Sequence, residues 1–121
     1  MVACLCVALG GAVGSVLRYL VSLIDLGETT AFPYKTLVVN VAGAFVIGLL
    51  VALAAKSAAL SDNWMLCLKV GLCGGFTTFS TFALETVTLT QDGKWGIALC
   101  YVLLSVLLSL AAVFSAEAIV K

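Results

Sequence analysis

The chain has 121 residues, of which 64% are hydrophobic and only 10% are charged, and its mean hydropathy is +1.26. Soluble domains are about half apolar and a quarter charged, so this composition excludes a soluble protein and predicts an integral membrane protein. Acidic and basic residues balance at six each and histidine is absent, so we expect neither an enzyme nor a nucleic-acid-binding protein.

Four apolar runs are long enough to cross a bilayer, whose hydrocarbon core needs about 20 apolar residues per helix. The runs cover residues 2–24, 33–55, 64–89 and 95–118. The connections, at about 25–33, 56–63 and 90–94, are short and rich in turn-forming and charged residues. We therefore predict an all-α integral membrane protein with four transmembrane helices, which form a single domain over residues 1–121.

The first run carries Arg18 about two thirds along its length. An ionisable residue inside a bilayer is costly and is a functional candidate by default. Its guanidinium could face a water-filled vestibule, where it would attract anions, pair with an acid, or snorkel to the interface. The same run contains Gly10 and Gly14, whose spacing predicts close packing against another helix.

The second run places Thr36 and Asn40 on one helical face, since residues four apart are neighbours on a helix. The asparagine amide carries two N–H donors and no charge, which suits holding an anion without trapping it. A hydrogen bond between helices is the common alternative for such a residue in a membrane. The sequence leaves both interpretations open.

The third run contains the most informative segment, residues 71–82, which reads Gly-Leu-Cys-Gly-Gly-Phe-Thr-Thr-Phe-Ser-Thr-Phe. Paired glycines weaken a helix, and threonine hydroxyls compete for backbone hydrogen bonds. Non-helical backbone survives at bilayer depth only where protein or water satisfies it. We therefore predict a break in the third helix, with polar groups gathered around the break.

Phe79 and Phe82 follow the glycines on one helical face, with Ser80 and Thr81 between them. Aromatic rings have a positive edge, so two ring edges can line a largely dry anion path. Phenylalanines in a membrane helix more often pack in the core or against lipid, and only the polar surroundings favour the functional interpretation. Glu85, one turn later on the same face, could carry protons, accept hydrogen bonds while neutral, or contact a cation.

The fourth run supplies Tyr101, Ser105 and Ser109 at i, i+4, i+8 spacing, a stripe of hydroxyl groups in an otherwise aliphatic helix. A single serine in a membrane helix often bonds to its own backbone four residues earlier, so packing explains any one of them. Three in line favour a polar track along one helix face.

The lysines near the helix ends give little orientation bias. Lys35 and Lys94 flank one side of the membrane, and Lys56, Lys121 and the borderline Lys69 flank the other. The near tie fits either an ordinary single orientation or insertion in both directions. In the second case two copies would pair as an antiparallel dual-topology homodimer, which would also give so small a chain an interior.

Three segments carry a family resemblance. They are Gly10-Gly11-x-x-Gly14-x-x-x-Arg18-Tyr19, Thr36-Leu37-x-Val39-Asn40-x-x-Gly43-x-Phe45-x-x-Gly48, and Gly71-x-x-Gly74-Gly75-Phe76-Thr77-Thr78-Phe79-Ser80-Thr81-Phe82. In this order, on three of the four predicted helices, they resemble the Fluc family of small bacterial fluoride channels, also called CrcB. The length of the chain matches the family, and the third segment is highly specific.

The resemblance implies antiparallel dual-topology dimers with two pores, which passively and selectively export cytoplasmic fluoride across the plasma membrane, here a bacterial inner membrane. It implies that pore residues are Phe79 and Phe82 through their ring edges, Asn40 through its amide, and a hydroxyl track of Ser80, Thr81, Thr36, Tyr101, Ser105 and Ser109, with Glu85 close to it. It further implies a structural sodium ion at the dimer centre, held by backbone carbonyls of Gly74 and Thr77, while Arg18 matches the family's first-helix arginine. One departure is Lys35, which stands where family members commonly have glycine and puts a charge near one end of the pore.

Two other functions compete with the channel. A proton-coupled exporter of the small multidrug resistance type has a similar size, but such exporters use a first-helix glutamate where this chain has Arg18, so Glu85 would have to serve. A non-conducting assembly subunit would use its polar residues only to hold helices together. Some relatives of the Fluc type also pair two different chains, and the charge balance favours a homodimer only weakly.

Overall fold

The structure is a computed structural model that describes residues 1–27, 29–57 and 60–121. Residue 28 in the first predicted connection and residues 58–59 in the second lie outside the described residues. Within the described ranges all regular secondary structure is helical, as predicted. The elements are α1 (Val2–Ser22), α2 (Tyr34–Lys56), α3 (Asp62–Met65), the π-helix η1 (Leu66–Cys73), α4 (Gly74–Phe76), α5 (Phe79–Gln91) and α6 (Trp95–Val120).

Four helical stretches of the described chain are long and apolar enough to cross a membrane, so this is a multi-pass membrane protein. Three of them are α1, α2 and α6, and the fourth runs from α3 through α5, over Asp62–Gln91. The third span is therefore longer at both ends than the predicted 64–89. It ends where Gly93, with a φ of 75°, turns the chain so that the Lys94 amide bonds the Leu89 carbonyl at 2.8 Å.

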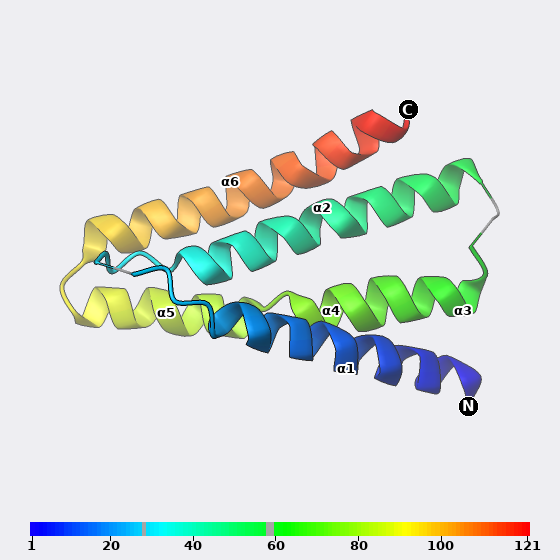
Figure 1. Ribbon diagram of the computed structural model, residues 1–121. Coiled ribbons are helices and arrows are strands. Elements are labelled where there is room, and N and C mark those ends of the chain that lie inside the picture. The colour runs from blue at the N-terminus through cyan, green and yellow to red at the C-terminus, as the bar shows by residue number, and fades with distance from the viewer. Residues whose placement is uncertain (28, 58–59) are drawn as a thin grey trace.

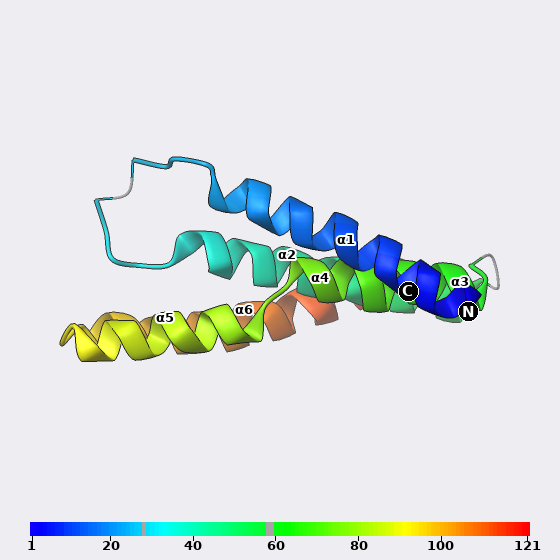
Figure 2. The same ribbon diagram turned by 90° about the horizontal axis from the view of Figure 1, so that it is seen from below.

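The spans are arranged in two pairs (Figures 1 and 2). α2 and α6 lie side by side over most of their length, and α1 lies against the η1–α4 part of the third span. α5 leaves α1 and packs along the first half of α6. The two termini lie at the same end of the bundle, as an even number of spans requires.

The third helix is broken, as predicted, but the break lies at the two threonines and not at the glycines. Thr77 (φ −77°, ψ 159°) and Thr78 (φ −152°, ψ 117°) have extended backbone between α4 and α5. The Thr78 hydroxyl accepts the Thr81 amide at 3.2 Å and so caps α5. Gly74 and Gly75 remain helical within α4.

Glycines hold α1 against η1 and α4, as their spacing predicts. A Cβ built at Gly71 would lie 2.7 Å from the Val7 carbonyl oxygen, and one at Gly75 would lie 2.6 Å from that of Gly11. A Cβ at Gly10 would meet the Cys67 carbonyl in the same way. These contacts are with backbone, which cannot move aside cheaply, so the small residues permit the close approach of the helices.

A small core joins the other helices at the end where α5 lies. Leu37 of α2, Leu89 of α5, and Ala98 and Tyr101 of α6 are buried together, with Phe82 packed against them. This cluster fixes α5 between α2 and α6, so the polar residues of three helices meet just beyond the break.

Candidate functional site

Glu85 accepts a hydrogen bond from a hydroxyl on each side. Thr36 Oγ1 donates to Glu85 Oε1 at 2.7 Å, and Tyr101 Oη donates to Glu85 Oε2 at 2.6 Å. Thr36 and Tyr101 are buried, and Glu85 is partly buried. Of the roles that the sequence left open, the geometry favours Glu85 as a hydrogen-bond acceptor that ties α5 to α2 and α6.

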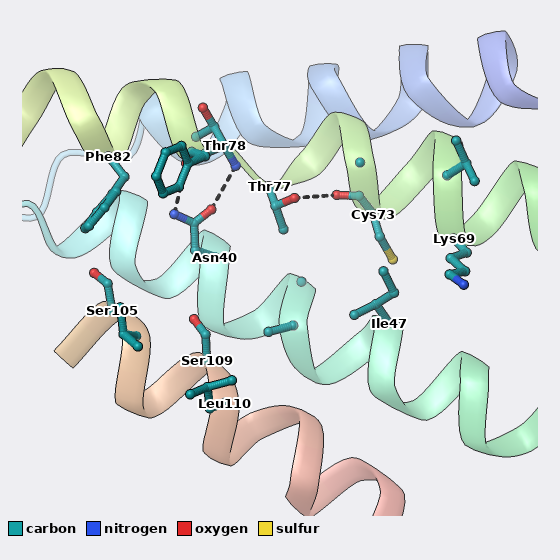
Figure 3. Close-up of a pocket in the computed structure, with 16 residues that line it drawn as sticks. Asn40, Ile47, Lys69, Cys73, Thr77, Thr78, Phe82, Ser105, Ser109 and Leu110 are labelled. Atoms are coloured by element: carbon teal, nitrogen blue, oxygen red, sulfur yellow. Dashed lines mark hydrogen bonds between the residues drawn. The ribbon is translucent and has the colours of Figure 1, made fainter. Parts of the chain in front are cut away.

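Asn40 forms a paired hydrogen bond with the backbone of the break (Figure 3). Its Nδ2 donates to the Thr78 carbonyl at 3.1 Å, and the Thr78 amide donates to Asn40 Oδ1 at 2.8 Å. The amide therefore replaces the helical partners that the extended threonines lost. An asparagine amide has two N–H groups, and this pairing uses one of them, so the other can serve a ligand.

An aromatic row extends from the break into the core. The ring centroids of Phe79 and Phe82 are 5.5 Å apart with planes tilted by 42°, and those of Phe82 and Tyr101 are 5.1 Å apart. Phe79 is 80% exposed, although it belongs to a segment at the middle of the third span. Tilted rings present edges as well as faces to their surroundings, as an anion contact requires.

Phe79 and Phe82 line an open groove of about 640 Å³ between the third span and α6, with α2 as its floor. We call this hollow the groove. The polar residues along it are Asn40, Thr77, Thr78, Ser105 and Ser109, with Lys69 and Cys73 nearer the α3 end. Figure 3 shows Asn40, Ser105 and Ser109 directed toward the space between the helices. Five of the ten expected pore residues therefore share one lining, namely Phe79, Phe82, Asn40, Ser105 and Ser109.

A second hollow of about 400 Å³, which we call the vestibule, lies on the α1 side of the break. Its lining includes Arg18, Lys35, Thr36, Thr78, Thr81 and Glu85. Arg18 Nε donates to the Gly75 carbonyl at 3.2 Å, and Lys35 Nζ donates to the Ser22 carbonyl at 3.3 Å. Thr78 lines both hollows, so the Asn40–Thr78 pair stands between a vestibule with two cations and the groove.

The predicted hydroxyl track divides into groups with different partners. Ser80 is exposed and its Oγ lies 3.3 Å from Thr78 Oγ1, which donates to Thr81 Oγ1 at 3.0 Å. On α6, Tyr101 is turned to Glu85, whereas Ser109 lines the groove. The Ser105 hydroxyl is buried and has no hydrogen-bond partner among the residues that the structure describes. A buried hydroxyl without a partner is costly, so the Ser105 hydroxyl is suited to hydrogen-bond a ligand in the groove.

Two carbonyls at the break have lost their usual helical donors. The Thr78 amide, which would bond the Gly74 carbonyl in an unbroken helix, donates to Asn40, and the Thr81 amide donates to the Thr78 hydroxyl instead of the Thr77 carbonyl. Unwound backbone carbonyls are the groups with which membrane proteins hold sodium. Gly74 is exposed. Among the described residues no cluster of histidine, cysteine, aspartate or glutamate could hold a metal ion.

Sequence reasoning missed Thr78 as a site residue. Its backbone pairs with Asn40, and its hydroxyl caps α5, contacts Ser80 and bonds Thr81. The available signal was that Thr78 stands three residues before Thr81, the spacing at which an N-cap hydroxyl accepts a backbone amide. The sequence indicates only that Lys69 affects orientation, because it does not show which side of the helix faces the groove.

Known proteins resemble this chain over most of its length. Residues 5–116 match the family described as CrcB-like protein, Camphor Resistance (CrcB). The chain is 44% identical over 109 residues to the Fluoride-specific ion channel FluC of Saccharophagus degradans, covering 90% of this chain and 82% of that protein. Proteins of the same name from Agrobacterium fabrum and Flavobacterium psychrophilum are each 46% identical, over 93% and 95% of this chain and 91% and 94% of their own length.

Proposed function

Because the chain belongs to the family of CrcB-like proteins, we propose that it is a passive, fluoride-selective channel of a bacterial plasma membrane. The relatives that carry the name of a fluoride-specific ion channel are bacterial proteins that match nearly the whole chain. The single observation that carries the proposal is the groove, where Phe79, Phe82, Asn40 and Ser105 share one lining.

This lining suits a small, strongly hydrated anion. A selective pore must replace the water around fluoride with converging donors in a narrow path, whereas a wide aqueous pore would pass chloride equally well. The groove offers the remaining N–H of Asn40, the unpartnered hydroxyl of Ser105, the hydroxyl of Ser109 and the aromatic edges. All of these donors are neutral, so they can bind an anion without holding it by a full opposite charge.

Passive flow is sufficient for export. Fluoride enters cells as neutral hydrogen fluoride and dissociates inside, and an inside-negative potential drives the anion out by about 2.3 kcal/mol per charge per 100 mV. The sequence contains no glycine-rich ATP-binding loop. Arg18 and Lys35 in the vestibule would raise the local concentration of anions at one mouth of the path.

A second, antiparallel copy of the chain would complete the pore. The groove is open along one side, and Phe79 is 80% exposed there. In a solitary membrane subunit, this opening and the Phe79 ring would face lipid. The near balance of lysines on the two sides permits both orientations. The freed carbonyls of Gly74 and Thr77 would hold a sodium ion between the copies, where its charge would fix the two breaks against each other.

The relatives and the structure give no support to a proton-coupled exporter that uses Glu85. Both carboxylate oxygens of Glu85 accept hydroxyl hydrogen bonds, and the first helix carries Arg18 in place of an acid. Such an exporter must move protons with each substrate, whereas a channel needs only the gradient of the ion itself.

The experiment that tests the proposal is fluoride efflux from proteoliposomes with and without a proton gradient. Purified protein is reconstituted with internal potassium fluoride, and valinomycin clamps the counter-charge. A channel releases fluoride at a rate that does not depend on an imposed pH difference of one unit, and Glu85→Gln leaves that independence unchanged. Efflux that requires the pH difference and loses this requirement in Glu85→Gln would establish the exporter instead.

A further inference from the structure

We propose that Lys69 is an anion-attracting residue of the conduction path, at the end of the groove away from Phe82. The inference rests on the proposed fluoride channel and extends its path from the break along η1. It assigns a role to a lysine that is otherwise relevant only to the orientation of the chain.

The register of the third span turns Lys69 to the groove. Lys69, Cys73 and Thr77 follow one another at a spacing of four residues, and all three line the groove. Figure 3 shows the Lys69 side chain extending from η1 toward α2, further from the break than Cys73 and Ile47. Lys69 precedes Thr77 by eight residues, roughly two helical turns.

Lys69 is the only charged residue among those that line the groove. No hydrogen bond or ion pair joins its ammonium group to another residue in the part of the chain that the structure describes. Glu85 lines the vestibule and accepts hydrogen bonds from Thr36 and Tyr101. A cation on a membrane-spanning helix therefore faces a hollow without a carboxylate, where water or an anion must balance its charge.

The hydroxyls of α6 lie along the groove at the break. Ser105 lies opposite Phe82, and Ser109, one turn further along α6 in the direction of Lys69, lies opposite Asn40 (Figure 3). On the other side of the Asn40–Thr78 pair, the vestibule holds Arg18 and Lys35. An anion that crosses the pair would thus leave one cationic hollow and enter another, and low-dielectric walls strengthen the attraction of such charges.

The alternative for Lys69 is snorkelling. Its four-carbon stem could carry the ammonium to the membrane surface, where the residue would serve only topology. The two roles differ in what removal of the charge does to ion flow at low fluoride concentration.

The test compares Lys69→Gln with Lys94→Gln and Lys69→Arg in fluoride efflux from proteoliposomes. Lys94 lies in the exposed turn between α5 and α6, outside both hollows, so its replacement removes the same charge without touching the path. We expect Lys69→Gln to lower flux about threefold to tenfold at low fluoride and low ionic strength, with the deficit shrinking in high concentrations of an impermeant salt. Lys69→Arg keeps the charge and should conduct like the unchanged protein, as should Lys94→Gln.

The outcomes separate the inference from the function on which it rests. Equal flux in Lys69→Gln and Lys94→Gln, at every salt concentration, would overturn the role of Lys69 while leaving the channel intact. A deficit that salt does not relieve, or that Lys69→Arg shares, would show a structural role and would also overturn it. Absence of fluoride efflux from the unchanged protein would contradict the proposed function itself. Elution of each variant as the same oligomer confirms that the comparison is made on folded protein.

Discussion

The two halves of the third span are held in place by different means. Before the break, η1 and α4 lie against α1 through glycine backbones, with no room for a Cβ at Gly71 or Gly75. After the break, α5 is held by side-chain hydrogen bonds: Asn40 pairs with the backbone of Thr78, and the hydroxyls of Thr36 and Tyr101 donate to Glu85. The first half is held mainly by close backbone packing, and the second by hydrogen bonds together with the core cluster.

This difference indicates that different residues of the third span control stability and ion conduction. Close backbone packing tolerates almost no added volume, because the contacts are with carbonyl and amide groups that cannot move independently. Polar side chains around the break can change their chemistry while α5 keeps its position in the core cluster of Leu37, Leu89, Ala98 and Tyr101. We therefore expect substitutions of the packed glycines before the break to act on folding, and substitutions of the polar and aromatic residues that line the groove to act on flux.

A large loss of stability is expected for Gly14→Ala. A Cβ at Gly14 would meet the Leu72 carbonyl and would lie 2.8 Å from the Phe76 amide nitrogen, so α1 must separate from η1 and α4. We expect a loss of about 3 kcal/mol of stability, measured as a lower melting temperature in detergent. Gly11→Ala is the matched control, since its Cβ would lie 3.9 Å from the Gly71 carbonyl oxygen, and equal melting of the two variants would contradict the packing account.

The largest effect on flux is expected for Phe79→Ile. The ring is 80% exposed in the single chain, so its removal costs little packing within the subunit. Loss of the aromatic edge should raise the barrier to fluoride by about 1.4 kcal/mol or more, a tenfold or greater fall in flux. Efflux assays on the variant, with its oligomeric state checked by size-exclusion chromatography, measure this. Normal flux from an intact oligomer would remove Phe79 from the pore lining.

Asn40→Asp is expected to lower fluoride flux, as Phe79→Ile does, and also to cause a modest loss of stability. The carboxylate can still accept from the Thr78 amide, but it cannot donate to the Thr78 carbonyl, and it places a negative charge in the groove. The lost hydrogen bond should cost about 1 kcal/mol of stability, and the charge should repel fluoride. Fluoride efflux and the melting temperature, measured on one preparation, separate the two effects. Unchanged efflux would mean that Asn40 only fixes the break.

The smallest effect is expected for Ser105→Ala. The Ser105 hydroxyl is buried with no partner among the described residues, so its removal should leave stability equal or slightly higher. If the hydroxyl donates to passing fluoride, flux should fall by about threefold, corresponding to the loss of a hydrogen bond worth a little under 1 kcal/mol. Ser80→Ala, at an exposed position, is a useful comparison. Lower stability without a change in flux would make Ser105 a packing residue.

Much of this arrangement can be predicted from the sequence. Apolar length alone predicts four spans, the glycine spacing predicts close packing of helices, and the segment 71–82 predicts a break. The position of the break within that segment was not predictable, because glycine propensity suggests Gly74 and Gly75, whereas both are helical and Gly75 packs against the backbone of α1. Neither was the pairing of Asn40 with Thr78, since the partner of a membrane-embedded amide depends on how distant helices meet.

The measurement that tests the central claim most directly is the ratio of fluoride to chloride efflux from the purified, reconstituted protein. Vesicles are loaded in parallel with potassium fluoride and potassium chloride, valinomycin carries the counter-charge, and ion-selective electrodes follow both anions. The neutral donors and ring edges that line the groove at the break predict rapid release of fluoride with almost no release of chloride. Equal release of both anions would contradict a dry, selective path, and release of neither from a folded oligomer would contradict the channel.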